Sequence, residues 1–242
     1  MTTQCEHCPL RRLDIFLPMS KDELHFMQRF KTGELTAEEG TEILAQDASS
    51  SQLYTVLSGM GVRYTTLEDG RRQVIGFVMP GDFVGLQAGV MGEMHHSVEA
   101  TTSMKLCVFN RSELWSLFKS HPHRAFDLTH LAAREEQLLG ESLAAVGQLD
   151  GVGKVAWALL RFYRRLSALD LVRNGRCKLP YRQQDLADAI GLSLVHTNKT
   201  LAKLREGGVV TWASDELIVH DEARLRKLAR QVDVETEARP LV

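Results

Sequence analysis

Residues 180–208, "PYRQQDLADAIGLSLVHTNKTLAKLREGG", constrain the fold more than any other part of the chain. Two short helical patterns flank "GLS", and Leu186 and Ile190 mark the inner face of the first helix. Ala187 is small where two helices must cross closely, and Ser193 can cap the second helix. The stretch predicts a helix-turn-helix whose second helix can enter the major groove of DNA.

The neighbouring sequence supports this prediction. "VVTWASDELIVH" follows the second helix and predicts two strands around a Ser-Asp turn, which would form a wing. Residues 154–205 hold 11 Lys/Arg and 3 Asp/Glu, whereas residues 1–150 hold 13 and 20. Charge alone is also explained by a solvated basic face, but charge combined with the two helices, the cap and the wing favours a polyanionic partner. Thr197 departs from the pattern, because an apolar core residue is usual there.

The N-terminal half has a different sequence pattern. Residues 20–32 predict a short helix, with Ser20 as its cap and Glu23 completing a capping box. From about residue 33 to 110, short apolar runs alternate with turn signals such as "EDGR". Several short strands at this spacing favour a double-sheet roll.

A long helix is expected next, because about 26 residues from Arg124 contain no proline. A coiled-coil-like stripe runs along it, formed by Leu128, Leu131, Leu138, Ala145 and Leu149. The stripe favours pairing with a second copy in a homodimer. The alternative is a helix that packs only on its own roll.

The segments together predict an α+β chain in five parts. These are an N-terminal segment (1–19), a β-roll sensor domain (20–121), a dimerisation helix (122–150), a winged helix-turn-helix (151–232) and a flexible tail (233–242). We find no apolar run long enough for a membrane span and no secretory signal, so we expect a cytoplasmic protein without membrane contact. Cysteines in that compartment are better metal or redox candidates than disulfides.

The order of these parts resembles the Crp/Fnr family of bacterial transcription regulators, over about residues 14–222. "PGDFVG" at residues 80–85 is a good signature of that family. The resemblance implies a jelly roll of the cyclic-nucleotide-binding type (a double-stranded β-helix), a long dimerisation helix and a C-terminal winged helix-turn-helix. It also implies a homodimer on a two-fold symmetric site in double-stranded DNA, with RNA polymerase as a further partner. No catalytic constellation stands out, so we do not expect an enzyme.

One branch of the family binds a cyclic nucleotide through a Glu and an Arg-Ser pair. Leu86 stands in place of the Glu, and His96-Ser97 in place of the Arg-Ser. A phosphate and ribose would then lack partners, so we expect no cyclic nucleotide. His95 and His96 are adjacent and are interpreted as surface residues.

The oxygen-sensing Fnr branch has a Cys-x2-Cys-x5-Cys run before its first helix and one distant Cys. Cys5 and Cys8 match the first two positions, Cys107 matches the distant one, and Asp14 stands at the third. The resemblance implies a [4Fe-4S] cluster held by the three thiols and Asp14. Alternatives are water or His7 as the fourth ligand, a three-iron cluster, and no cluster at all.

Each cysteine feature also has a simpler interpretation. The Cys-x2-Cys pair can be half of a zinc site or a thiol redox pair, and Cys107 can be a buried strand cysteine. Cys177 is interpreted as structural. The joint match favours a regulator that senses oxygen, redox state or nitric oxide through the cluster, whose state controls dimerisation and DNA binding. The alternative is the same scaffold without a cluster, controlled by haem, a small molecule, thiol redox or expression level.

The resemblance also assigns roles within the second helix of the helix-turn-helix. Val195, Asn198 and Lys199 match base-reading positions. Asn can read adenine, Lys guanine and Val a thymine methyl group. The positions matching phosphate contacts are Arg182, Gln183, Ser193 and His196.

Overall fold

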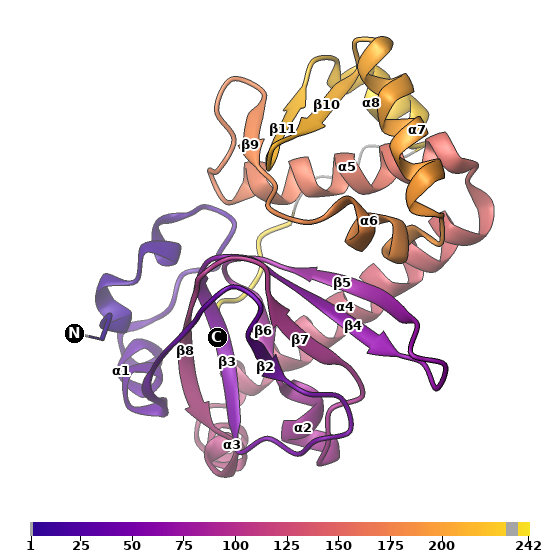
Figure 1. Cartoon of the computed structure of the whole chain (residues 1–242). Helices are drawn as coiled ribbons and strands as arrows, with labels where there is room; N and C mark the ends of the chain where they lie inside the picture. Colours follow the sequence, from indigo (N-terminus) through magenta and orange to yellow (C-terminus); the bar gives the residue numbers. More distant parts are fainter. Residues whose placement is uncertain (1, 231–236) are drawn as a thin grey trace. The chain divides into compact units, whose positions relative to one another are not determined.

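The computed structural model describes residues 2–230 and 237–242, and its backbone forms two compact units (Figure 1). Unit 1 comprises Met1–Glu135 and Ala238–Val242, and unit 2 comprises Glu136–Glu237. The division falls inside the long helix α4 (Pro122–Gln148). The helix is therefore shared between the units and is not a separate compact part.

Unit 1 is built around two antiparallel four-stranded sheets, as the sequence predicts. One sheet has the order β1-β8-β3-β6 and the other β2-β7-β4-β5. The strands are β1 (Lys31–Ala37), β2 (Glu42–Leu44), β3 (Gln52–Ser58), β4 (Gly61–Thr66), β5 (Arg72–Val78), β6 (Phe83–Val84), β7 (Ser97–Ala100) and β8 (Met104–Asn110). Apolar side chains from both sheets, such as Val56, Val98 and Leu106, form one buried core.

Short helices surround these sheets. They are η1 (Cys5–His7), η2 (Pro9–Arg12), α1 (Lys21–Phe30), α2 (Leu86–Met91), η3 (Arg111–Glu113) and α3 (Leu114–Ser120). The predicted capping box of α1 is present, because the Glu23 amide donates to Ser20 Oγ (3.2 Å) and the Ser20 amide donates to Glu23 Oε2 (2.8 Å). The predicted "EDGR" turn joins β4 to β5, with the Leu67 amide donating to the Arg71 carbonyl (2.8 Å).

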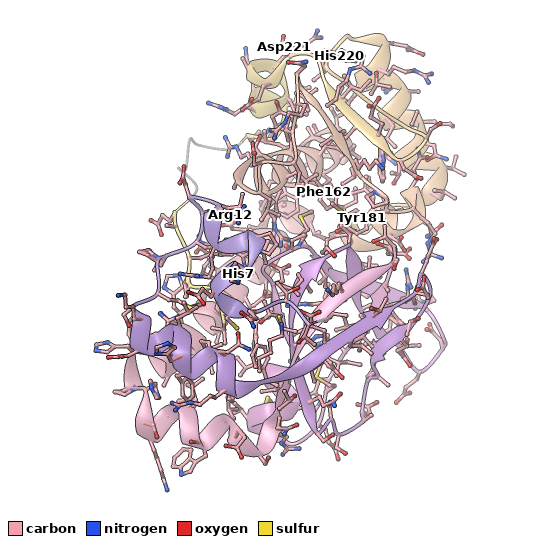
Figure 2. All side chains as sticks on the ribbon, turned by 90° about the vertical axis from the view of Figure 1, so that its left-hand side faces the viewer. His7, Arg12, Phe162, Tyr181, His220 and Asp221 are labelled. Carbon is pink, nitrogen blue, oxygen red and sulfur yellow. The ribbon has the colours of Figure 1, made fainter. Side chains whose placement is uncertain are left out.

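Unit 2 contains the predicted helix-turn-helix and wing. Its elements are α5 (Gly151–Ala168), β9 (Arg176–Lys178), α6 (Gln183–Ile190), α7 (Leu194–Glu206), β10 (Val210–Ala213), β11 (Glu216–Val219) and α8 (Glu222–Leu228). Gly191 ends α6 at φ 65°, a left-handed conformation that glycine adopts without steric cost. The Phe162 and Tyr181 rings stack in the unit's interior with centroids 5.5 Å apart (Figure 2).

The predicted flexible tail needs correction over its last five residues. Ala238–Val242 pack onto unit 1, with Leu241 and Val242 only 5% and 4% exposed. The prediction was based on the polar composition of the tail. Leu241 and Val242 nevertheless pack on the roll, and Arg239 forms an ion pair there. Residues 233–236 of the predicted tail lie outside the described residues.

The predicted seam of α4 faces the chain itself. Leu128, Leu131 and Ala145 are buried within the protomer, and Leu138 and Leu149 are half-buried. The exposed apolar side chains of α4 are instead Phe126 (70%), Leu139 (49%) and Leu143 (75%). Three of the five predicted dimerisation residues thus pack within the protomer, and the dimerisation role of the repeat stays a prediction. Among the described residues, no helix is both long and apolar enough to cross a membrane.

Candidate functional sites: a thiol pocket and a nucleic-acid interface

Three of the four cysteines line one small pocket in unit 1. Cys5 lies in η1, Cys8 lies between η1 and η2, and Cys107 lies in β8. The cavity measures about 40 Å³, room for a very few water molecules. Its other walls are formed by Thr3, Gln4, Leu10, Arg11, Met19, Met27, Lys31, Thr55, Leu57, Phe109, Leu241 and Val242. The fold therefore brings the three predicted thiol ligands together from two distant parts of the sequence.

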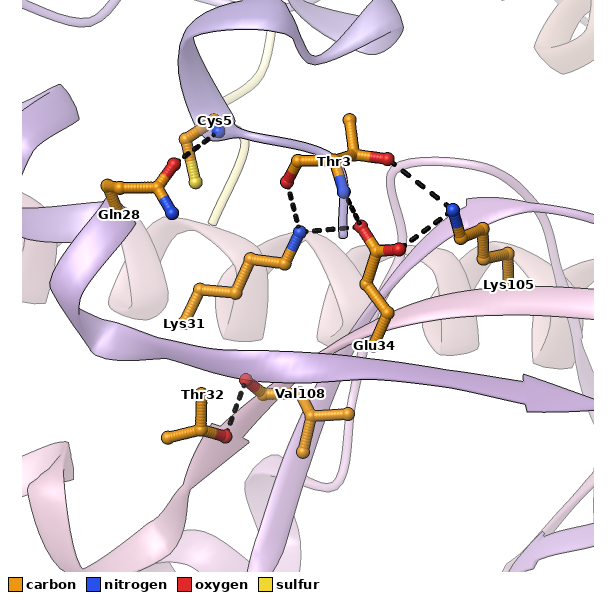
Figure 3. A network of polar contacts seen from close by, with 8 residues as sticks. All are labelled: Thr3, Cys5, Gln28, Lys31, Thr32, Glu34, Lys105 and Val108. Carbon is orange, nitrogen blue, oxygen red and sulfur yellow. Dashed lines mark hydrogen bonds and ion pairs between the residues drawn. The ribbon is translucent and has the colours of Figure 1, made fainter. Parts of the chain in front are cut away.

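A buried charge network holds the N-terminal segment at this pocket (Figure 3). Lys31 Nζ donates to the Thr3 carbonyl (2.5 Å) and to Glu34 Oε1 (2.7 Å). The Thr3 amide donates to the same Glu34 oxygen (2.7 Å), and Lys105 pairs with Glu34 Oε2 (2.7 Å). Glu34 pairs in register with Cys107 on the neighbouring strand, so the network adjoins the pocket.

The backbone around Cys5 is also fixed. Its amide donates to Gln28 Oε1 of α1 (2.7 Å). Arg11 Nη1 donates to the carbonyls of Cys5 (3.3 Å) and Glu6 (3.1 Å). Side chains from α1 and η2 therefore set where the first thiol lies.

Burial controls the charge of the thiols. It raises the pKa of Cys107 to about 12, although the Lys31 ammonium acts in the opposite direction. The pKa of Cys5 is also raised, again mainly by burial and again opposed by Lys31. At neutral pH both thiols are therefore protonated in this structure.

Glu34 has the opposite behaviour. Burial acts to raise its pKa, but hydrogen bonds from Lys105 and Lys31 dominate and hold it at about 2. Burial likewise acts to lower the pKa of Lys31, yet the bond to Glu34 and the nearby cysteines raise it overall. Lys31, one of the residues that line the pocket, is thus held in an ammonium–carboxylate pair with Glu34.

The predicted fourth ligand is not at the pocket. Asp14 is exposed, and it is not among the residues that form the walls. His7, the other candidate, is also exposed, on η1 (Figure 2). Within the described residues, no group of three or more His, Cys, Asp or Glu is arranged to hold a metal ion. Cys5, Cys8 and Cys107 thus line one pocket without forming a metal-binding group within the described residues, and Asp14 lies at the surface.

His96 corrects one expectation about the roll. It is buried, with 9% exposure, whereas its neighbour His95 is exposed as predicted. Burial lowers the pKa of His96 to about 4, and the positive charges of Arg63 and His95 add to that effect. His96 directly precedes β7 and points inward, so the position that corresponds to the family's Arg carries a neutral imidazole.

The candidate nucleic-acid interface lies on α7. Ser193 caps the helix as predicted, accepting a hydrogen bond from the His196 amide (3.2 Å). The inner face of α7 is formed by Thr197, Thr200, Leu201 and Leu204, all buried. The side chains of Val195, His196, Asn198 and Lys199 are exposed. The predicted base-reading residues are therefore available to a ligand outside the protomer.

The predicted phosphate-contacting residues differ in their exposure and in their contacts within the protomer. Arg182 is 64% exposed at its side chain and pairs with Asp185, which is fully buried (2.8 Å). Gln183 is half-buried at the first position of α6. The His196 ring lies against the backbone of α5, where a Cβ added to Gly151 would come within 2.5 Å of His196 Nε2. Packing and ion pairing therefore orient Arg182 and His196 before any ligand binds.

Comparisons with known proteins agree with the roll and with the helix-turn-helix. The cyclic nucleotide-binding domain family matches residues 34–121, and the Crp-like helix-turn-helix domain family matches residues 153–228. The chain is 30% identical to the nitrogen fixation regulation protein FixK of Azorhizobium caulinodans, over 78% of this chain and 75% of that protein. The chain belongs to the Crp/Fnr family of transcription regulators. It is therefore a DNA-binding regulator, and its relatives are transcription regulators and not enzymes.

Other Crp/Fnr relatives match over nearly the whole length. The transcriptional activatory protein AadR of Rhodopseudomonas palustris is 29% identical, over 94% of this chain and 96% of that protein. FnrL of Cereibacter sphaeroides, a transcriptional activator, is 27% identical over 92% and 90%. The solved structure of FixK2 from Bradyrhizobium japonicum superposes with a TM-score of 0.75, at 26% identity over 83% of this chain and 98% of that one.

Sequence reasoning missed part of the thiol pocket. Lys31 and Glu34 look like an ordinary surface pair three residues apart, and nothing local indicates that both side chains are buried. Leu241 and Val242 lie in a segment with a polar composition. The available signal was the pair of apolar residues after Pro240, which a freely solvated tail does not need.

Proposed function

We propose that the DNA affinity of this regulator is set by the state of the thiol pocket, through an iron–sulfur cluster held by Cys5, Cys8 and Cys107. The observation that carries the proposal is the convergence of these three thiols on one cavity. Cysteine thiolates are the usual protein ligands of such clusters. Oxygen, nitric oxide or another redox signal that removes the cluster would then be the regulatory input.

The donor set suits this cofactor at three positions. Three thiols serve three irons, and the Lys31 ammonium would offset part of the negative charge that thiolates bring. Asp14 does not line the pocket, so we propose that another ligand fills the fourth position. A bound cluster supplies a redox-sensitive bond between the N-terminal segment and β8. The chain's own residues must then transmit the loss of this bond to α4.

Contacts within unit 1 connect this segment to α4. The segment leads into α1, where Glu23 pairs with Arg124 at the start of α4 (3.1 Å). Arg124 also pairs with Asp127 one turn later (2.6 Å). The Phe26 ring of α1 stacks on His121, directly before α4, with centroids 3.8 Å apart. A displaced N-terminal segment would therefore disturb the base of α4 first.

The regulator then acts through dimerisation. The exposed residues Leu139 and Leu143, one turn apart, give α4 an apolar patch on which a second copy can pack. Two recognition helices in a two-fold dimer read half-sites one helical turn apart, so loss of the dimer lowers DNA affinity. RNA polymerase is the further partner we propose, since AadR and FnrL are named as activators.

Anaerobic purification followed by a visible spectrum, iron and sulfide analysis and a DNA-binding titration tests the proposal. We expect a brown protein with about three to four irons per chain that fades in air and loses DNA affinity. Cys107→Ser should abolish the colour and the air-dependent change. Cys177→Ser is the matched control, because Cys177 is buried in β9 of unit 2. Asp14→Ala should retain the cluster. A colourless wild type whose DNA affinity equals that of Cys107→Ser in air and without air would refute the proposal.

A metal-free thiol switch is the second candidate function. The small cavity favours it, because it brings Cys5, Cys8 and Cys107 together without a metal ion. The raised pKa values of Cys5 and Cys107 act against it, because the thiolate is the form that reacts. In this case peroxide would take two electrons and two protons from two of the thiols, forming one disulfide and two waters. Iron-free protein whose DNA affinity changes with peroxide and recovers with dithiothreitol would favour this candidate over the cluster.

A further inference from the structure

The last described segment, Ala238–Val242, is bound to the roll through its backbone. The Arg239 amide donates to the Ile15 carbonyl (2.8 Å), and the Leu17 amide donates to the Arg239 carbonyl (2.9 Å). These two bonds form a parallel β-bridge on either side of Phe16. The segment therefore adds to the structure as a strand would, and both of its partners lie directly after η2.

The Arg239 side chain anchors the segment. Its guanidinium pairs with Asp82 (3.1 Å), with side chains only 13% and 6% exposed, and donates to the Pro80 carbonyl (3.3 Å). It also lies over the Phe16 ring, 5.1 Å from the centroid. Gly81 has φ 83°, and any Cβ at that position would collide with the Phe16 ring. The glycine and aspartate of "PGDFVG" thus form the socket for this arginine.

The two apolar side chains that follow enter the thiol pocket. Leu241 and Val242 line the same cavity as the three thiols and are almost fully buried. The Thr55 hydroxyl donates to the Val242 carbonyl. Thr55 lies on β3, in register with Cys107 on β8. Cys107 is therefore flanked by the Glu34 network on one side and by the partner of Val242 on the other.

We propose that Ala238–Val242 is an intramolecular plug that closes the thiol pocket and shields Cys107 from solvent and from ligands. With the plug seated the cavity is only about 40 Å³, so a cluster or a bulky thiol adduct must displace Leu241 and Val242. Arg124 Nη1 also donates to the Leu241 carbonyl (3.4 Å), so plug release removes a contact of the same arginine that joins α1 to α4. The regulatory meaning of the plug depends on the proposed function of the pocket.

Maleimide labelling of the reduced, metal-free protein, with each cysteine quantified by mass spectrometry, tests the plug. In a chain ending at Glu237, maleimide should label Cys107 at least about tenfold faster than in wild type, because the reagent can reach the thiol without prior local opening of the plug. Arg239→Ala should give a smaller increase. Arg71→Ala is the matched control, since Arg71 forms an exposed ion pair with Asp69 on the same unit. Cys177, buried in unit 2, reports any global loss of structure.

Unchanged labelling of Cys107 in the shortened chain would overturn the plug. Where Cys177 also labels faster, a synthetic peptide of residues 237–242 decides the matter. The peptide should restore protection of Cys107, and a scrambled peptide that protects equally well would overturn the proposal. The labelling test contains neither DNA nor metal. It can therefore refute the plug while the DNA-binding test still supports thiol control, and the plug can be supported while the DNA-binding test refutes thiol control.

Discussion

At the scale of single residues, burial decides charge in unit 1. His96 is neutral at pH 7 because burial lowers its pKa to about 4, with Arg63 and His95 as additional causes. Cys107 is protonated because burial raises its pKa to about 12. Glu34 stays ionised because Lys105 and Lys31 both donate to it. A pocket with this pattern holds its thiols unreactive until something replaces their protons.

His96 should make the protein sensitive to mild acid. An unfolded histidine titrates near pH 6.5, so the unfolded state takes up a proton while folded His96 does not. The stability that this gives is complete above about pH 6.5 and is lost as the pH falls towards 4. Between pH 7 and pH 5 the loss should be on the order of 2 kcal/mol. Urea unfolding of wild type and His96→Gln at both pH values measures it.

His95→Gln is the matched control for this prediction. His95 is exposed and adjacent, so its substitution should leave the wild-type pH dependence unchanged. The burial argument would be wrong if His96→Gln kept the full loss of stability between pH 7 and pH 5.

Thr197 offers a second prediction for a single residue. It is fully buried in α7, and within the described residues its hydroxyl has no hydrogen-bond partner. Thr197→Val replaces the hydroxyl with a methyl group of similar size, and we expect about 1 kcal/mol of added stability. Chemical denaturation should show a higher midpoint with an unchanged slope. A lower midpoint would mean that the hydroxyl is satisfied.

At the scale of elements, α7 separates packing from recognition by its two faces. The buried face holds the helix on α6 and α5, while Val195, Asn198 and Lys199 project outward. The cap at Ser193 fixes where the helix begins, and so fixes which residues reach the outer face. An element of this kind can change its target sequence without changing the fold.

Lys199→Ala should weaken binding to the cognate site by about 1–3 kcal/mol and relax preference at one base pair. Lys203→Ala, in the last turn of the same helix, should leave the preference unchanged. Binding titrations on the cognate site and on single-base variants at constant salt measure both effects. If Lys199→Ala binds every site with the wild-type order of affinity, Lys199 does not read a base.

At the scale of the whole molecule, the fold links a thiol pocket to a helix with an exposed apolar face. Leu139 and Leu143, one turn apart on that helix, are exposed in the protomer, as is expected of a surface that a second copy covers. Glu23, Arg124 and Asp127 connect the base of that helix to the segment that carries Cys5 and Cys8. The proposed control of association by the pocket would act through these contacts.

Leu143→Asp should convert the dimer to a monomer, because it places a charge on the apolar face of α4. Sedimentation velocity should show the halved mass, and affinity for a two-fold DNA site should fall by about tenfold or more. Leu171→Asp alters an exposed leucine of unit 2 outside any helix and should leave both properties unchanged. A dimer that persists in Leu143→Asp would place the interface elsewhere.

The amino-acid sequence by itself determined the features that depend on a few neighbouring residues. The capping box of α1, the turn between β4 and β5, the Ser193 cap and the two helices around Gly191 follow from local hydrogen bonding and backbone preference. Cys5, Cys8 and Cys107, singled out by their spacing, line one pocket; their role as cluster ligands stays a prediction.

Only the tertiary structure decided the features that depend on long-range packing. It buried His96, left Asp14 at the surface, buried Leu128, Leu131 and Ala145 of α4 within the protomer, and placed Leu241 in the pocket that Cys107 also lines. A periodic pattern shows that one face of a helix is apolar, but not whether the chain or a second copy covers it. Likewise, a ligand spacing shows which residues can meet, while burial and the competing contacts of the whole fold decide which of them do.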